Sequence, residues 1–430
     1  MRIVTAKPAT LGELIQYHRQ RKNISLSKLQ ELVGLDKGNL SRIENGEVKR
    51  PNFNIIESIA AVLDIPSEDI VEQYIEIGHK SNVIYAFLQK AVAAFYSPSL
   101  ITKIATKYLE SPKEDTLDLI ENLYQMTDSL EDTSIQLSLY SLIIDYSRAH
   151  GIMPYIAKGL YQKYMIERDD FSRLNETYTV GRAILNYADF LSHDERITFY
   201  YKLGCHAYVL RLYEDCIELC SNVIRNDKAD SFLKAEAFYA LCNSYYYLGD
   251  AASARYYLDE YSKFSFPHVI ENIKFMTGSI NGKLGNIDLA ITQLEDCLKN
   301  SSEYNFVYIA VSLFELYLQK KDFSAIEKLL SNEEKIANMN IVTPFRRYIL
   351  AYFYKLKGDF LMYNNVYIAT AFEYYAKGAH EYMKVNMYTE AFECFNCIAK
   401  EALESKNIEL YVSALQKMNK MYSELSKKPK

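Results

Sequence analysis

A repeating pair of helical segments constrains the fold of this chain more than any other feature of its sequence. The segments "AEAFYALCNSYYYLGDAASARYYLDEY" from Ala235 and "IENIKFMTGSINGKLGNIDLAITQLEDCL" from Ile270 each read as a helix, a Leu-Gly turn and a second helix with alanine near its start. Gly249 and Gly285 occupy the turn in these segments and lie 36 residues apart. A period of this length, built from two helices, is typical of solenoids, in which each pair buries its apolar face against the next pair.

The turn position can be followed along the chain in both directions. Lys321 continues the series 36 residues on, Gly358 follows after a further 37, and Arg211 precedes Gly249 by 38. The period and the paired helices resemble the tetratricopeptide repeat. The resemblance covers at least residues 195–378, with looser versions on either side. The chain has no Trp, so Tyr and Phe stand where that repeat usually has Trp.

Length and composition agree with an all-α protein of more than one domain. The chain has 430 residues, of which 49% are hydrophobic, enough for a sizeable core. Pro is scarce, strand-like alternation is nearly absent, and apolar residues recur at helical spacing. We therefore expect a compact first domain at residues 1–66, connecting helices at 67–96 and a repeat domain at 97–430.

Several classes of protein are disfavoured by what the sequence lacks. The start "MRIVTAKPATLGELI" has no continuous apolar stretch like that of a secretory signal, and no apolar run is long enough to span a bilayer. We expect a cytoplasmic protein without membrane association. Cys394 and Cys397 are spaced as CxxC without a second pair, which favours buried thiols over a metal site. No catalytic constellation emerges, so we expect no enzyme activity, no catalytic residues, no metal and no cofactor.

The charge of the chain is divided unevenly. Residues 1–66 hold ten Lys or Arg and seven Asp or Glu, a formal charge of +3. Because the whole chain carries -6, the remainder carries -9. A small basic head on a large acidic body suits contact between the head and phosphate.

The head reads as four short helices separated by tight turns. A first helix is expected from Thr10 to Arg21. Ser25 is suited to cap a second helix, "LSKLQELV", and Gly34 to end it in the left-handed conformation. Asp36 is suited to cap a third helix, "KGNLSRIE", before a turn and a fourth helix. The residues expected to face inward on the second and third helices are Leu26, Leu29, Leu32, Val33, Leu40 and Ile43.

The stretch "ISLSKLQELVGLDKGNLSRIENGEVKRPNFNIIESIAAVLDIP" resembles the DNA-binding domain of the phage-repressor (Cro/CI, or XRE) family, over nearly all of residues 10–66. In a helix-turn-helix the second helix of the motif reads base edges in the major groove. The resemblance implies an ion pair between Arg19 and Glu44, and departs from the family at Gly38, where relatives often carry a polar reader. It implies base contacts from Lys37 and Arg42, with lesser ones from Asp36, Asn39 and Ser41, and phosphate contacts from Ser25, Lys49 and Arg50.

The repeat domain is expected to present a concave wall formed by the first helix of each pair. Tyrosine and side-chain amides on such a wall suit an extended peptide, because amides pair with its backbone and rings pack its side chains. Arg346 and Arg347 could receive a carboxylate. Packing of helix on helix is the alternative role for each tyrosine and for Asn243, and it stays open here. The candidate peptide-binding residues are Tyr201, Tyr208, Glu236, Tyr239, Asn243, Tyr246, Asn272, Phe275, Arg346 and Arg347; further wall positions are Tyr247, Ser279, Tyr308, Glu315, Tyr348 and Tyr352.

A helix-turn-helix head joined to tetratricopeptide repeats resembles the RRNPP family of peptide-pheromone-responsive transcription regulators. The resemblance implies an all-α fold, with the helix-turn-helix followed by a tetratricopeptide-type α-solenoid. It implies a homodimer or higher homo-oligomer that binds double-stranded DNA and is switched by a short signalling oligopeptide in the concave groove. The alternative is an adaptor whose repeats bind and regulate another protein, such as a phosphotransfer signalling protein, with DNA binding as a second activity.

Overall fold

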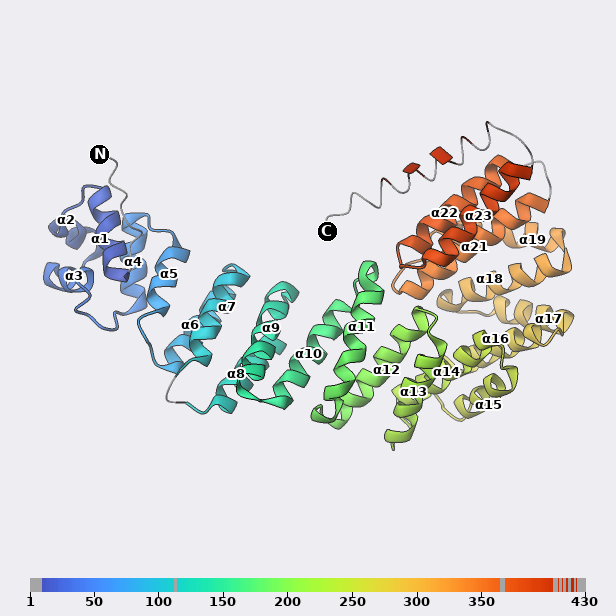
Figure 1. Cartoon of the computed structure of the whole chain (residues 1–430), viewed down its shortest axis with the longest axis horizontal. Helices are drawn as coiled ribbons and strands as arrows, with labels where there is room; N and C mark the ends of the chain where they lie inside the picture. The colour runs from blue at the N-terminus through green and yellow to red at the C-terminus, as the bar shows by residue number, and fades with distance from the viewer. Residues whose placement is uncertain are drawn as a thin grey trace. The chain divides into compact units, whose positions relative to one another are not determined.

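The computed structural model describes residues 10–111, 114–363 and 368–404, and the isolated positions 409, 412, 415, 416, 419, 420 and 423. Helices make up the regular structure of these residues (Figure 1), which confirms the all-α class. The chain divides into two compact units, Met1–Ile166 and Glu167–Lys430.

The first unit contains short helices in the head and longer ones after it. They are α1 (Leu11–Arg21), α2 (Leu26–Val33), α3 (Lys37–Glu44), α4 (Phe53–Leu63), α5 (Ser67–Ile75), α6 (Ser81–Ala93), α7 (Pro98–Leu109), α8 (Thr116–Asp128), α9 (Thr133–His150) and α10 (Met153–Glu167).

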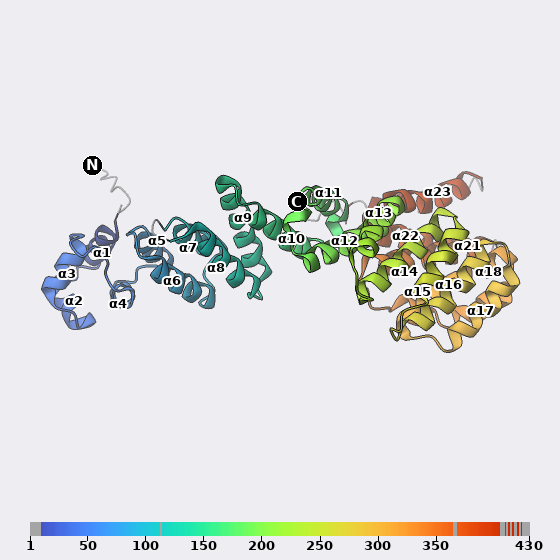
Figure 2. The same cartoon turned by 90° about the horizontal axis from the view of Figure 1, so that it is seen from below.

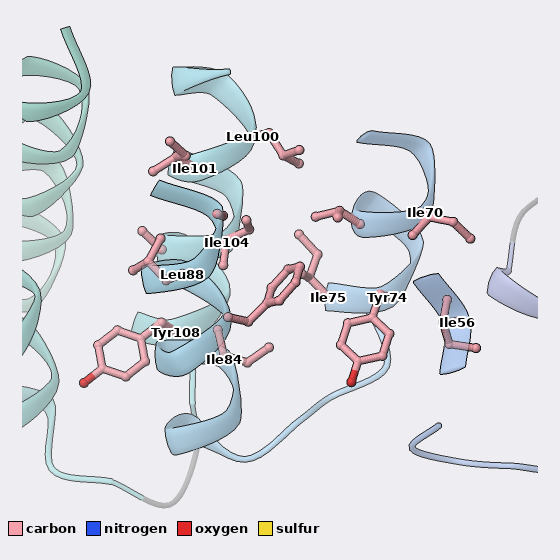
Figure 3. Close-up of a cluster of buried hydrophobic side chains, with 14 of the residues drawn as sticks. Ile56, Ile70, Tyr74, Ile75, Ile84, Leu88, Leu100, Ile101, Ile104 and Tyr108 are labelled. Carbon is pink, nitrogen blue, oxygen red and sulfur yellow. The ribbon is translucent and has the colours of Figure 1, made fainter. Parts of the chain in front are cut away.

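One hydrophobic cluster runs through the first unit without a break. Figure 3 shows its middle part, where Ile56 of α4, Tyr74 of α5, Leu88 of α6 and Ile104 of α7 are all buried. The cluster therefore crosses both of the predicted domain boundaries, after residues 66 and 96. Those boundaries stay predictions, but the helices after the head share its core.

The second unit is a stack of helix pairs. Its helices are η1 (Phe171–Arg173), α11 (Leu174–Ile184), η2 (Leu185–Phe190), α12 (His193–Val209), α13 (Tyr213–Asn226), α14 (Phe232–Leu248), α15 (Ala251–Tyr261), α16 (Val269–Lys283), α17 (Ile287–Lys299), α18 (Glu303–Lys320), α19 (Phe323–Leu330), α20 (Glu333–Ala337), α21 (Pro344–Tyr363), α22 (Ile368–Met383) and α23 (Tyr388–Glu404). In Figure 2, α14, α16 and α18 follow one another across the second unit, and α21 packs against α18, as successive first helices of a tetratricopeptide-type solenoid do.

The turn between the helices of a pair repeats with the predicted spacing. Gly249 and Gly285 adopt left-handed backbone conformations, with φ of 83° and 85°. Arg211 and Lys321 take the same conformation, with φ of 62° and 58°, although a side chain makes it unfavourable. At two of these four turns, a residue other than glycine adopts the left-handed conformation. The repeat therefore keeps its turn geometry even where the local sequence disfavours it.

The assignment of Gly358 to this turn is wrong. Gly358 lies inside α21, which continues to Tyr363, and it faces α22 at a close approach. A Cβ atom at Gly358 would lie 2.7 Å from Cε1 of Tyr375. Gly278 has the same role in α16, where an added Cβ would lie 2.8 Å from Cδ2 of Leu294. Gly358 therefore serves the crossing of two helices and not the turn between them.

Small residues also recur five positions after each turn, on the second helix of the pair. Cys216, Ala254, Ala290 and Ala391 are each at most 1% exposed, and a Cβ added at Gly282 in α16 would lie 3.6 Å from Cβ of Ala290 in α17. Ile326 fills the corresponding place in α19. These side chains let the two helices approach closely along each pair.

The stack in the second unit closes on itself. Leu174 of α11 belongs to the same buried cluster as Phe372 of α22. Arg211, in the turn after α12, forms an ion pair with Glu390 of α23. The first and last helix pairs of this unit are therefore in contact.

One inward position in the head was predicted wrongly. Leu29 and Leu40 are buried, as expected, but Leu32 is 50% exposed. Because α2 is only two turns long and begins at the surface, its inward face is narrower than the run of leucines suggests.

Among the described residues, no helix combines the length and hydropathy that crossing a bilayer requires.

We predict that Gly358→Ala destabilises the protein, although alanine favours helix. The ring of Tyr375 cannot move aside easily, because its hydroxyl donates to Oδ1 of Asp359 at 2.8 Å. Overpacking should outweigh the gain in helix propensity and lower the free energy of unfolding by about 1–2 kcal/mol in urea denaturation. Gly282→Ala is the control, since its Cβ would lie 3.2 Å from a methyl carbon of the flexible Leu316 side chain and 3.6 Å from Cβ of Ala290, at ordinary contact distance. Equal stability of Gly358→Ala and the parent chain would contradict the crossing role.

Candidate functional site

The helix-turn-helix of the head is formed by α2, a short turn and α3. Ser25 caps α2, since its hydroxyl accepts from the backbone N–H of Lys28 at 3.1 Å. Gly34 ends α2 in the left-handed conformation, with φ of 73°. Asp36 caps α3, since its carboxylate accepts from the N–H of Asn39 at 3.0 Å. These caps confirm where both helices were expected to begin and end.

A further contact joins the two helices directly, and sequence reasoning missed it. Oε1 of Gln30 accepts from the backbone N–H of Lys37 at 3.2 Å. The side chain of α2 thereby satisfies one of the free N–H groups at the start of α3. A lone glutamine on a polar helix face offers no local signal for this role.

A buried ion pair connects α3 to α1, as the family resemblance implied. Nε and Nη2 of Arg19 donate to the two carboxylate oxygens of Glu44 at 2.6 and 2.8 Å. Nη1 of Arg19 donates to the carbonyl oxygen of Ile24 at 3.0 Å. The hydrogen bond to Glu44 raises the pKa of Arg19. This bidentate pairing of the Arg19 guanidinium with the Glu44 carboxylate restricts the rotation of α3 about its own axis.

The outer face of α3 carries most of the predicted base-reading residues. Lys37, Asn39 and Arg42 are exposed, and Ser41 is half-buried. Arg42 lies 3.8 Å from Glu47 at the surface, a separation at which an ion pair contributes little. Asp36 is also exposed, but its carboxylate is used as the cap of α3.

The predicted phosphate contacts lie at the edges of the motif. Lys49 is exposed in the segment after α3. Nε of Arg50 donates to the carbonyl oxygen of Gly78 at 3.1 Å, so this side chain is partly engaged within the first unit. Ser25 stands at the N-terminus of α2, where backbone N–H groups and the helix dipole favour an anion.

The predicted peptide-binding residues lie on the first helices of the pairs in the second unit. Most of them are half-buried: Tyr201, Tyr208, Glu236, Tyr239, Asn243, Tyr246, Phe275 and Arg347; Asn272 and Arg346 are buried. Burial raises the pKa of the hydroxyls of Tyr208 and Tyr239 well above the usual value. Side chains that stay partly accessible although protein surrounds them are expected on a concave face.

Aromatic contacts fill part of this face. The ring of Tyr208 lies 5.2 Å from that of Phe345 in α21 and 6.0 Å from that of Tyr247 in α14. Phe345 in turn lies 5.7 Å from Tyr348, and Arg211 lies over the Tyr348 ring at 5.8 Å. At this level, rings from opposite sides of the closed stack pack together. For Tyr208, the packing role weighed in the sequence is therefore observed.

The three polar candidates Asn243, Asn272 and Glu236 differ in which of their hydrogen-bonding groups are already engaged. Nδ2 of Asn243 donates to the carbonyl oxygen of Tyr239 one turn earlier at 2.8 Å, a bond that uses one of its two amide hydrogens. Glu236 lies 2.8 Å from Nε2 of His268.

Asn272 is engaged on both sides of its amide. Its Nδ2 donates to the hydroxyl of Tyr261 at 3.0 Å, and its Oδ1 accepts from Nδ2 of Asn305 at 3.1 Å. Such a network favours a structural role, because a buried amide without partners would be costly.

The two neighbouring arginines of α21 lie in different surroundings. Nη1 of Arg347 donates to Oε2 of Glu381 at 2.6 Å. Arg346 is 7% exposed, its Nε has no hydrogen-bond partner among the described residues, and its guanidinium lies over the ring of Tyr304 at 4.8 Å.

The cysteines Cys394 and Cys397 lie on α23, where burial raises the pKa of both thiols.

The ion pair of Arg19 provides a test of how α3 is held. We predict that Arg19→Leu lowers the free energy of unfolding by about 3–5 kcal/mol, because Glu44 is left buried without a partner. The double variant Arg19→Leu, Glu44→Leu removes both charges and should regain most of that loss. Urea denaturation of the full chain measures both effects.

The exposed pair of Lys28 and Glu31, 2.8 Å apart, supplies the control. Lys28→Leu should change stability by no more than about 0.5 kcal/mol. A double variant as unstable as Arg19→Leu alone would show that the charge left behind is not what destabilises the domain.

Comparison with known proteins identifies the head. The family described as the Cro/C1-type HTH DNA-binding domain matches residues 15–74. The HTH-type transcriptional regulators SinR of Bacillus subtilis and of Bacillus licheniformis are each 33% identical over 63 residues. The match covers 15% of this chain and 57% of each SinR, so the chain spans little more than half the length of these relatives.

A solved structure covers most of the chain, at low sequence identity. The crystal structure of Bacillus thuringiensis PlcR in complex with the peptide PapR7 and DNA aligns over 90% of this chain and 98% of that one, with 13% identity and a TM-score of 0.26. Residues 15–74 thus match the Cro/C1-type HTH DNA-binding domain and contain the helix-turn-helix of α2 and α3, and the chain continues beyond them into stacked pairs of helices.

Proposed function

We propose that this protein is a cytoplasmic transcription regulator. It binds operator DNA through the helix-turn-helix and is switched by a short signalling peptide bound on the concave face of the second unit. We expect it to act as a homodimer or higher homo-oligomer, since operators read by such domains are usually two half-sites. The observation that carries the proposal is the geometry of α3, together with the family match of the domain that contains it.

The DNA-binding part rests on how α3 is presented. Its polar face is exposed, its apolar face is buried, and the pair of Arg19 with Glu44 fixes its orientation. Arg42 and Lys37 carry the donors that recognise guanine O6 and N7 in the major groove. SinR, to which this head is similar, is an HTH-type transcriptional regulator, which agrees with this role.

The ligand-binding part rests on the first helices of the second unit. Tyr239, Asn243 and Tyr246 follow one another along the half-buried face of α14. The amide of Asn243 bonds to the backbone carbonyl oxygen and to the side chain of Tyr239, and its own carbonyl oxygen can accept from a peptide N–H. Rings beside an amide supply apolar contact and backbone hydrogen bonds at once.

For a ligand on the second unit to change DNA binding, a structural change must reach the helix-turn-helix in the head. The hydrophobic cluster of the first unit joins α1 and α4 to the helices that follow them (Figure 3). A displacement of α6 or α7 would therefore move the head as a packed body. In a dimer, such a movement changes the separation of two recognition helices and so their fit to two half-sites.

The direct test of ligand binding is calorimetry. The flanks of the gene would be searched for a short reading frame with a basic start, an apolar run and a polar tail, and the tail peptide titrated against the full chain. Saturable binding supports the proposal. A chain that binds no such peptide, but co-purifies with one stoichiometric protein partner, would favour the adaptor function instead.

We predict that Arg42→Ala weakens specific DNA binding by about 1–3 kcal/mol without loss of stability. The side chain is exposed and its contact with Glu47 is long, at 3.8 Å. Fluorescence anisotropy with operator DNA measures the loss. Arg148→Ala removes an equally exposed arginine from α9 and should leave the affinity unchanged. An unaltered affinity of Arg42→Ala would exclude this residue from base recognition.

We predict that Asn243→Ala abolishes the response to peptide and leaves DNA binding intact. The peptide backbone would lose its amide partner, whereas the head would be untouched. Asn226→Ala is the matched control, because Asn226 makes the same bond to its own helix, to the carbonyl of Asn222 at 2.7 Å, but on the second helix of a pair. Peptide titrations of both variants distinguish them. A fully responsive Asn243→Ala variant would place the ligand elsewhere.

A further inference from the structure

Arg346 is a buried cation that forms no ion pair within the part of the chain that the structure describes. Its side chain is on the first turn of α21, and the residue is 7% exposed. Nε is buried and makes no hydrogen bond, and no carboxylate among the described residues forms an ion pair with the guanidinium. Leaving a charged group in this state costs several kcal/mol in a typical protein interior.

Comparably placed arginines of the second unit are paired. Arg347, the next residue, bonds to Glu381 at 2.6 Å. Arg211 pairs with Glu390. The absence of an acid beside Arg346 therefore distinguishes it from the arginines that hold helix pairs together.

Aromatic rings of α18 hold Arg346 in place. The guanidinium lies 4.8 Å from the centre of the Tyr304 ring. Tyr304 is 53% exposed and lies 5.6 Å from Tyr308, which stacks at 5.8 Å on Phe345. A ring face offsets part of the cost of a buried cation but supplies no acceptor for its N–H groups. Because Tyr304 borders solvent, an acceptor can reach this place from outside.

We infer that Arg346 is a carboxylate-binding site at the α18–α21 end of the concave face, and that it anchors one carboxylate of the bound peptide. This inference rests on the proposed function. The planar fork of a guanidinium matches a carboxylate, and charge-assisted bonds of this kind are among the strongest in proteins. The carboxylate belongs either to the C-terminus of the peptide or to an acidic side chain.

Three small probes separate these sources. N-acetylglycine carries a terminal carboxylate, N-acetylaspartic acid α-amide carries only a side-chain carboxylate, and N-acetylglycinamide carries none. Each is titrated into the full chain labelled with ¹⁵N-arginine, and the Nε–Hε signals are followed by NMR. The signal of Arg346 is assigned by its loss in Arg346→Lys.

The Arg346 signal should shift saturably with a carboxylate probe, at a concentration about tenfold or more below that needed for the amide. Whichever of the two acids binds more tightly identifies the source. Arg173→Lys is the control, because lysine can keep the exposed pair with Glu176, 2.6 Å away, and Arg173 is outside the candidate peptide-binding set; it should leave the Arg346 response unchanged. Equal responses to acid and amide, or none to either acid, would overturn the inference.

The outcome is independent of whether the chain is a peptide-gated regulator. A carboxylate bound at Arg346, with no signalling peptide that changes DNA affinity, would support the site and contradict the proposed function. A peptide that changes DNA affinity equally well as the free acid and as the amide, with an unresponsive Arg346, would contradict the site and leave the proposed function standing.

Discussion

Close approach of paired helices is the constraint on which the second unit depends. Several pairs approach closely at a small residue, such as Gly278 in α16, Ala290 in α17 and Gly358 in α21. A helix pair of this kind cannot bury its apolar face alone, so stability comes from stacking successive pairs. The same geometry turns the first helix of every pair toward one face. Any ligand site on that face is therefore a consequence of how the pairs cross.

Much of the fold could be predicted because the period is stronger than local preference. Spacing alone placed Arg211 and Lys321 at the turn between paired helices, and the structure shows both in the left-handed conformation of Gly249 and Gly285, with φ of 62° and 58°. Gly358 was misplaced because glycine serves both turns and helix crossings, and the spacing could not tell the two uses apart. Only the contact with Tyr375 shows which use applies. Leu32 was misplaced because a two-turn helix buries fewer positions than its pattern suggests.

The candidate sites were less predictable, because they depend on partners distant in sequence. The pairing of Arg19 with Glu44 was accessible through the family resemblance, whereas local patterns would not have found it. Asn272 and Asn243 occupy similar first-helix positions, yet only Asn272 lies in a buried amide network. The sequence suggested Arg346 as a possible carboxylate receptor, but only the three-dimensional structure shows that its Nε is buried without a hydrogen-bond partner among the described residues.

The central claim is that ligand bound to the second unit changes how the head binds DNA, and the most direct measurement is the affinity for operator DNA with and without peptide. The full chain would be titrated into labelled promoter DNA from beside its gene, at zero and at saturating concentration of the neighbouring encoded peptide. The account predicts that the peptide changes the Kd for this DNA by about fivefold or more, in either direction. The same Kd with and without bound peptide would contradict it.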